Sequence, residues 1–125
     1  ITQRAAITAL SSDLKPTREM VKEFAARRKK VLELVKEIPG IQCPEPEGAF
    51  YVFPDISSYF GKSDGETVIN TASDFSLYLL HKAHFPSVLG DAFGEPKCVR
   101  FSFANSMQNI EEGWKRIKKA LAELK

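Results

Sequence analysis

The chain has 125 residues, 43% of them hydrophobic, which suits one domain with one modest core. Its 18 Lys and Arg nearly balance its 16 Asp and Glu, so the net charge of +2 gives no general argument for nucleic acid or an anionic membrane as partner. No stretch approaches the roughly 18 continuous apolar residues of a membrane span, and the opening residues do not resemble a signal peptide. Two isolated cysteines, Cys43 and Cys98, predict inert buried thiols in a reducing, cytoplasmic compartment.

Two helices are predicted first along the chain. Residues Ile1–Leu10 are Ala-rich and compatible with a helix, which a turn-like Ser-Ser-Asp segment ends. Because the sequence begins without Met and inside this helix-like run, we expect it to be a piece of a longer polypeptide. A second helix, Thr17–Ile38, follows, and Pro39-Gly40 ends it. Its apolar face recurs at helical spacing: Met20, Phe24, Val31, Val35 and Ile38.

The middle of the chain mixes strands with one helix. Ile41–Cys43 and the aromatic-rich Ala49–Phe53 are predicted strands, and Ser57–Gly65 is a predicted loop. Ala72–Ala83 has the apolar spacing of a helix. Phe85–Leu89 is a predicted strand, which Pro86 favours at an edge or in an irregular position; a loop over residues 90–96 follows.

The strand Lys97–Ala104 is the most informative element. Its alternation places Val99, Phe101 and Phe103 on one face and Arg100 on the other. A last helix, Met107–Leu124, follows with Ser106 as N-cap. The order of elements predicts an α+β domain, with helices packed on one face of a small mixed or antiparallel sheet. The other face of the sheet then turns toward solvent or toward an absent partner.

Arg100 is the main candidate for binding. It points away from the predicted core, with the small side chains Cys98 and Ser102 on the same face. A planar guanidinium with five donors suits a carboxylate or a phosphate. The alternative that the pattern leaves open is an exposed strand arginine paired with a nearby Asp or Glu.

For four other groups of residues, a structural role is preferred over a binding or catalytic one. His81 and His84 lie three residues apart without a further ligand at metal-site spacing. The serine pairs at 11–12 and 57–58 are explained by turns. The glycine-containing segment Gly90–Gly94 lacks the strand–GxGxxG–helix context of a dinucleotide site. The basic run Arg27–Lys30 is interpreted as a solvated helix face rather than a phosphate-binding patch.

Several segments together resemble fold-type I aminotransferases of the aspartate aminotransferase class, in the order that the family has them. The matching segments are Ile1–Ala6 (family S-x-x-Q-x-A-A), Phe24–Arg28 (F-x-x-R-R), Pro46–Pro54 (P-x-G-A-F-Y), and Gly90–Gly94 with Val99–Ala104 (P-G-x-x-F-G followed by x-R-x-S-x-A). One departure is Leu89, where the family has a proline. The resemblance covers nearly all of residues 1–125 and implies one unit, the C-terminal small domain.

The resemblance implies a role for Arg100, because the arginine of the R-x-S-x-A strand binds the α-carboxylate of the substrate in that family. It also implies a parent enzyme that is a homodimer and transfers an amino group between an amino acid and a 2-oxo acid with pyridoxal 5'-phosphate. The family's cofactor-binding lysine segment, S-K-x-x-x-x-x-G-x-R, has no counterpart here. We therefore expect no catalytic or cofactor-binding residue in this segment and no activity from it alone.

Two alternatives stay open at this point. The same scaffold supports lyases, decarboxylases and synthases that use the same cofactor, so the fold does not fix the reaction. A free-standing α+β module that binds a partner or a ligand is the other alternative.

Overall fold

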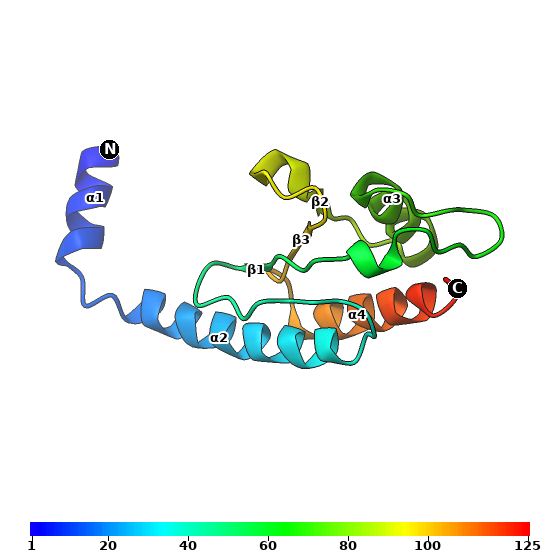
Figure 1. Cartoon of the computed structure of the whole chain (residues 1–125). Coiled ribbons are helices and arrows are strands. Elements are labelled where there is room, and N and C mark those ends of the chain that lie inside the picture. Colours follow the sequence, from blue (N-terminus) through cyan, green and yellow to red (C-terminus); the bar gives the residue numbers. More distant parts are fainter.

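The structure, a computed structural model, describes residues 1–125 and has an α+β architecture (Figure 1). Its elements in chain order are α1 (Thr2–Ser11), α2 (Lys15–Lys36), β1 (Tyr51–Val52), the 3-10 turn η1 (Ser57–Tyr59), α3 (Ala72–Ala83), β2 (Val88–Leu89), the 3-10 turn η2 (Gly90–Phe93), β3 (Val99–Ser102) and α4 (Met107–Leu121). No helix combines the length and the apolar character needed to cross a bilayer.

The sheet has the order β1-β3-β2, and both pairings are antiparallel. In the register, Tyr51 lies opposite Ser102 and Val88 lies opposite Arg100. The antiparallel form of the predicted sheet is therefore the one that occurs. β3 lies in the centre, so its residues are held on both sides, and Arg100 belongs to this central strand.

The predicted alternation on β3 is confirmed. Val99, Phe101 and Phe103 are all buried, while Arg100 between them is half-buried and Ser102 is exposed. The buried side chains join a core of 21 residues to which α2, α3, α4 and the strands all contribute. Figure 1 shows α2 and α4 side by side beneath the strands, with η2 on the opposite side of the sheet. The helices thus cover the inner face, and the outer face carries Arg100.

Local capping explains where two helices begin. Thr71 Oγ1 accepts a hydrogen bond from the Asp74 backbone N–H, and the Asp74 carboxylate accepts one from the Thr71 N–H, which is a complete capping box for α3. Ser106 Oγ accepts from the Asn109 N–H at the start of α4, as its sequence predicts. The boundaries predicted for α3 are confirmed at both ends.

The predicted strands are longer than those that form. Ile41–Cys43 contributes a single bridge, between Gln42 and Asp55. Only Tyr51–Val52 of the predicted strand Ala49–Phe53 is paired as β1, since Ala49 has a φ of 62°, outside the extended region. Phe85–Leu89 and Lys97–Ala104 likewise shrink to β2 and β3. Propensity predicts extended backbone but does not predict where a partner strand stops.

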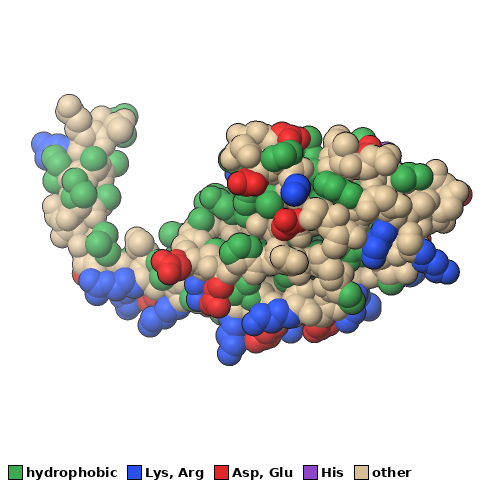
Figure 2. Space-filling view, viewed as in Figure 1, with side chains coloured by type: hydrophobic (Ala, Val, Ile, Leu, Met, Phe, Trp, Pro, Cys, Tyr) green, Lys and Arg blue, Asp and Glu red, His purple; other side chains and the backbone are tan.

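The first part of the chain stands away from the rest. Figure 1 shows α1 projecting from the start of α2, and every residue from Ile1 to Glu23 is exposed. Met20 is 54% exposed, so its predicted place in the buried face of α2 is wrong. The face is buried only from Val31 onward, because the shorter α4 packs only part of α2. Figure 2 shows apolar side chains along the projecting α1.

Candidate functional site

Arg100 is presented by β3 on the outer face of the sheet, as its alternation with Val99 and Phe101 predicts. Neither an Asp nor a Glu of this chain lies within salt-bridge distance of its guanidinium. The interpretation of Arg100 as a strand arginine neutralised by a nearby carboxylate is therefore wrong for this chain. A half-buried guanidinium without a carboxylate partner has the N–H donors that suit a carboxylate or a phosphate.

Two aromatic rings flank this guanidinium instead. The Arg100 Cζ atom lies 5.3 Å from the centroid of the Tyr51 ring and 4.9 Å from that of the Phe93 ring. Both distances lie within the roughly 6 Å over which a cation is attracted to the face of an aromatic ring. Sequence reasoning missed both rings and predicted only small neighbours around Arg100. The missed signal was the alternation of β1, where buried Val52 requires Tyr51 to share the outer face with Arg100.

The ring of Phe93 comes from η2, which a dense set of backbone hydrogen bonds holds against β3. The Gly90 N–H donates to the Cys98 carbonyl at 2.9 Å, and the Glu95 N–H donates to the Gly90 carbonyl at 3.1 Å. A Cβ atom at Gly90 would lie 2.5 Å from the Cys98 carbonyl oxygen, so only glycine fits this close approach. The Gly90–Gly94 segment therefore shapes a loop, as its sequence predicts, and the loop delivers Phe93 to Arg100.

Contacts between aromatic rings extend this cluster. Phe93 meets Phe53 edge to face at a centroid distance of 5.8 Å, and Tyr51 meets Phe50 in the same way at 6.0 Å. Phe93 is nevertheless 51% exposed. The arrangement as a whole is one cation with unpaired N–H donors in an aromatic setting, which suits a bidentate contact with a carboxylate.

The two histidines are placed apart from this cluster. His81 is exposed in the last turn of α3, and His84 is its C-cap residue with a φ of 50°. No group of three or more His, Cys, Asp or Glu side chains forms a possible metal site. His84 thus has a structural role as the residue that ends α3.

Turn chemistry accounts for the serine pairs. Ser11 and Ser12 donate to the carbonyls of Ile7 and Ala9 at the end of α1. Ser58 donates to the Gly40 carbonyl, which ties η1 to the turn that follows α2.

The cysteines are half-buried rather than fully buried, and both are free. Burial raises the pKa of the Cys43 thiol and also that of Cys98, whose pKa is further raised by the nearby Asp55 and Glu95 carboxylates. A raised pKa keeps a thiol protonated and weakly nucleophilic, so the interpretation of both as inert thiols agrees with their surroundings.

The basic run on α2 is partly paired. Arg28 lies 3.5 Å from the Glu45 carboxylate and donates to the Pro46 carbonyl, and Lys30 lies 3.2 Å from Glu111 on α4. Arg27 packs over the Phe24 ring of its own helix. These contacts describe a helix face that also ties α2 to its neighbours, in place of a phosphate-binding patch.

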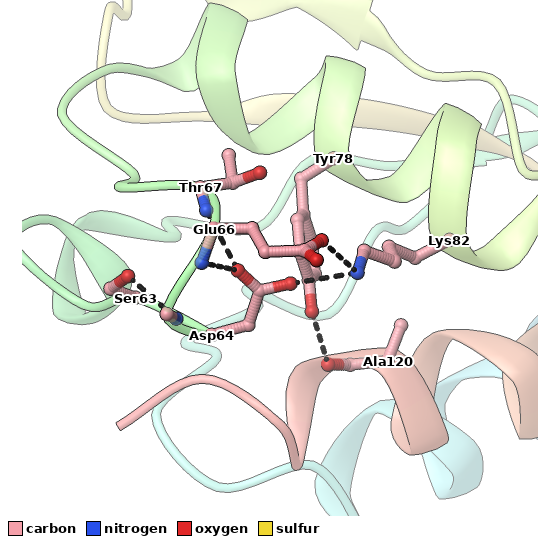
Figure 3. A network of polar contacts seen from close by, with 8 residues as sticks. Ser63, Asp64, Glu66, Thr67, Tyr78, Lys82 and Ala120 are labelled. Atoms are coloured by element: carbon pink, nitrogen blue, oxygen red, sulfur yellow. Dashed lines mark hydrogen bonds and ion pairs between the residues drawn. The ribbon is translucent and has the colours of Figure 1, made fainter.

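An ion pair away from Arg100 was also missed by sequence reasoning (Figure 3). The Asp64 carboxylate accepts backbone N–H bonds from Thr67 and Glu66 at 2.8 and 3.0 Å and lies 2.9 Å from Lys82 Nζ on α3. These hydrogen bonds, the Thr67 N–H first, lower the pKa of Asp64 to about 2, and the Asp64 carboxylate raises the pKa of Lys82. The pair fixes a loop to a helix, and both of its charges are satisfied.

Two surface cavities of similar volume do not include Arg100 in their lining. One, of about 460 Å³, lies between the end of β3 and α4, and its lining includes Ser102, Asn105 and Arg116. The other, of about 450 Å³, lies between the start of α2 and the segment before β1, and its lining is mostly apolar. The chemistry of the unpaired guanidinium, rather than the size of a cavity, identifies the candidate site.

Comparisons with known proteins show the family to which the chain belongs. The family described as aminotransferase class I and II matches residues 1–117. A bifunctional aspartate aminotransferase and glutamate/aspartate-prephenate aminotransferase of Petunia hybrida is 43% identical over 131 residues, and an aspartate aminotransferase of Streptomyces avermitilis is 38% identical over 120. These matches cover 100% and 96% of this chain but only 27% and 29% of the relatives.

Solved aminotransferase structures are similar to this chain over almost its whole length. The aspartate aminotransferase of Rhizobium meliloti superposes with a TM-score of 0.93 at 35% identity, over 98% of this chain and 31% of that protein. An aromatic aminotransferase of Pyrococcus horikoshii superposes with a TM-score of 0.82 at 35% identity, over 97% and 31%. The chain thus spans less than a third of the length of the relatives that it matches, and it belongs to the class I and II aminotransferase family.

Proposed function

We propose that this chain is the small-domain segment of a pyridoxal-phosphate-dependent aminotransferase, and that Arg100 binds the α-carboxylate of its substrates. The parent enzyme transfers an amino group between an amino acid and a 2-oxo acid. The observation that carries this proposal is the half-buried Arg100, which has no carboxylate partner in a chain of this family. The relatives are named aspartate, prephenate and aromatic aminotransferases, so the side chain of the preferred amino acid stays open.

In this proposal, Arg100 binds the carboxylate of the substrate and thereby orients the substrate. A bidentate contact fixes the plane of the substrate carboxylate and, through it, the direction of the Cα–H bond that must break. Both the amino acid and the 2-oxo acid carry this carboxylate, so one guanidinium serves both halves of the reaction. It matters that no Asp or Glu of this chain pairs with Arg100, because such a carboxylate would compete with the substrate for the same N–H donors.

The side chains around Arg100 do not fit the cofactor itself. One guanidinium flanked by the rings of Tyr51 and Phe93 offers neither a lysine amine nor a carboxylate for the pyridine nitrogen. When bound, pyridoxal phosphate supplies the electron sink for the reaction. The groups that hold it are therefore expected outside this chain, in the large domain of the parent enzyme.

Exposed apolar side chains on α1, on the start of α2 and just before β1 support contact with a large domain. Ile7, Leu10, Met20 and Phe50 are all exposed, and Met20 and Phe50 line the apolar cavity of about 450 Å³. An exposed cavity with a mostly apolar lining indicates an interaction surface. We infer that the large domain of the same polypeptide covers it, and that the parent enzyme is a homodimer, as is expected from its family.

The test of the role of Arg100 is Arg100→Lys in the full-length enzyme. Lysine keeps the charge but loses the planar two-point contact. We expect the substitution to cost about 2–5 kcal/mol of transition-state binding, which lowers kcat/KM for L-aspartate by roughly 30-fold to several thousand-fold. The melting temperature should hardly change, since Arg100 has no ion pair to lose. Near-wild-type kinetics would refute the role, and a collapsed melting temperature would indicate a structural arginine.

The 125-residue chain by itself should neither bind the cofactor nor transfer amino groups. The reason is the missing counterpart of the cofactor-lysine segment. Pyridoxal phosphate is titrated into the isolated chain while its absorbance is followed, and any adduct is trapped with borohydride and located by mass spectrometry. Saturable trapping at one specific lysine would contradict the proposal.

A further inference from the structure

We propose that Tyr51 and Phe93 are positioning residues, which hold the Arg100 guanidinium between their rings and leave its N–H donors free for the substrate carboxylate. The proposal rests on the function proposed above and explains how the side chain of Arg100 is held in its binding orientation. Arg100 lies within cation–π distance of both rings, at 5.3 and 4.9 Å.

The rings matter because nothing else in the chain fixes this side chain. Arg100 makes no side-chain hydrogen bond and no ion pair, although its strand is central. A free arginine side chain samples many rotamers, and ordering it at the moment of binding weakens affinity. Two rings that restrict the side chain beforehand remove part of that cost.

Aromatic rings suit this task better than a carboxylate does. A carboxylate would hold Arg100 through the same N–H donors that a substrate needs, and it would neutralise the charge. A ring interacts with the cation through its π-electrons and occupies no donor. The chain supplies two such rings and no acid, which is the combination expected where the arginine must be both fixed and available.

The backbone around the two rings is built to hold them in place. Tyr51 lies opposite Ser102 in the β1–β3 register, one diagonal step from Arg100 on the same face. Phe93 is held by η2, whose Gly90 N–H is bonded to the Cys98 carbonyl and whose tight approach excludes a Cβ atom. Phe93 is nevertheless 51% exposed, so burial in the core does not explain why an aromatic ring occupies this position.

The test uses the full-length enzyme with Phe93→Leu and Tyr51→Leu, which keep apolar bulk and remove the ring. We expect each to raise KM for both L-aspartate and 2-oxoglutarate by about 2- to 5-fold, the range of an exposed cation–π contact. Turnover should change less than KM, because the carboxylate is bound in the ground state as well as in the transition state. Phe93→Tyr and Tyr51→Phe keep a ring and should restore the wild-type KM.

A double-mutant cycle with Arg100→Gln shows whether the rings act through Arg100. In that background no cation remains, so Phe93→Leu should change KM no further. Wild-type KM in both leucine variants, or an equal rise in KM with and without the arginine, would overturn the proposal. If Arg100→Lys is impaired while the leucine variants are not, only the positioning role fails; if Arg100→Lys is unimpaired, the proposed function fails first. Should Tyr51→Leu lower the melting temperature sharply, Phe93→Leu, at its exposed position, decides the outcome.

Discussion

Charged side chains in this chain have different surroundings, and the surroundings decide what each charge does. Arg100 faces aromatic rings and has no carboxylate, so its charge is available to a ligand. Lys82 lies 2.9 Å from Asp64 and 3.4 Å from Glu66, so its charge is already neutralised. The same chemical property therefore suits binding at one position and structure at the other, and only the neighbours distinguish the two.

The Asp64–Lys82 pair predicts how stability depends on pH. The Asp64 side chain is only 4% exposed, and its pKa of about 2 lies below its ordinary value of 3.8. A lowered pKa in the folded state stabilises the fold above the unfolded-state pKa, and this stabilisation is lost as pH falls through the folded-state value. We expect Asp64→Asn to melt at a lower temperature than wild type at pH 7, with the difference shrinking between pH 3.8 and about 2.

Thermal melts of wild type and Asp64→Asn over that pH range check this expectation. Glu66→Gln is the matched control, because Glu66 is an exposed partner of the same lysine at a longer distance. Its effect on the melting temperature should be much smaller. A difference between wild type and Asp64→Asn that stays constant down to pH 2 would contradict the assignment.

Helices in this chain begin at defined caps, and the caps can be tested separately from the core. At the start of α3, Thr71 accepts from the Asp74 N–H at 3.2 Å and also donates its hydroxyl to the Asp74 carboxylate at 2.9 Å. α3 carries Phe75, Tyr78 and Leu79 into the core, so the position of its first turn matters to the whole domain. The cap therefore links a local sequence signal to tertiary packing.

Removal of the Thr71 hydroxyl should destabilise the domain moderately. We expect Thr71→Ala to lower the free energy of unfolding by about 1 kcal/mol, the usual cost of losing an N-cap. Thr71→Ser keeps the hydroxyl and should stay within about 0.5 kcal/mol of wild type. Urea unfolding of the three proteins measures both values, and equal losses for Ala and Ser would mean that the methyl group, not the cap, is responsible.

At the scale of the whole molecule, the hydrophobic core forms without a contribution from the first helix, α1. The 21 buried core residues run from Val31 to Leu124, and α1 contributes none of them. Tyr78 on α3 donates to the Ala120 carbonyl on α4 at 3.0 Å, which ties two of the core helices together. The domain that folds around β3 therefore depends little on residues before α2.

Deletion of residues 1–13 should leave the stability of the chain within about 0.5 kcal/mol of its original value, because the segment buries nothing. Ile117→Ala, at a fully buried position on α4, should instead cost about 2–5 kcal/mol. Urea unfolding of both variants compares them directly. A large loss on deletion would mean that α1 packs on the domain in solution.

The sequence by itself determined the helices, the α+β class, the outward direction of Arg100 and the family resemblance. These follow from short-range rules: apolar spacing along a helix, alternation along a strand, and caps within four residues. It did not predict that the strands would be so short, that Met20 would be exposed, or that Asp64 would pair with Lys82. Above all it did not place Tyr51 and Phe93 at Arg100, since these residues lie 49 and 7 positions away on other elements. Such neighbours are decided by strand register and loop closure, and therefore only by the tertiary structure.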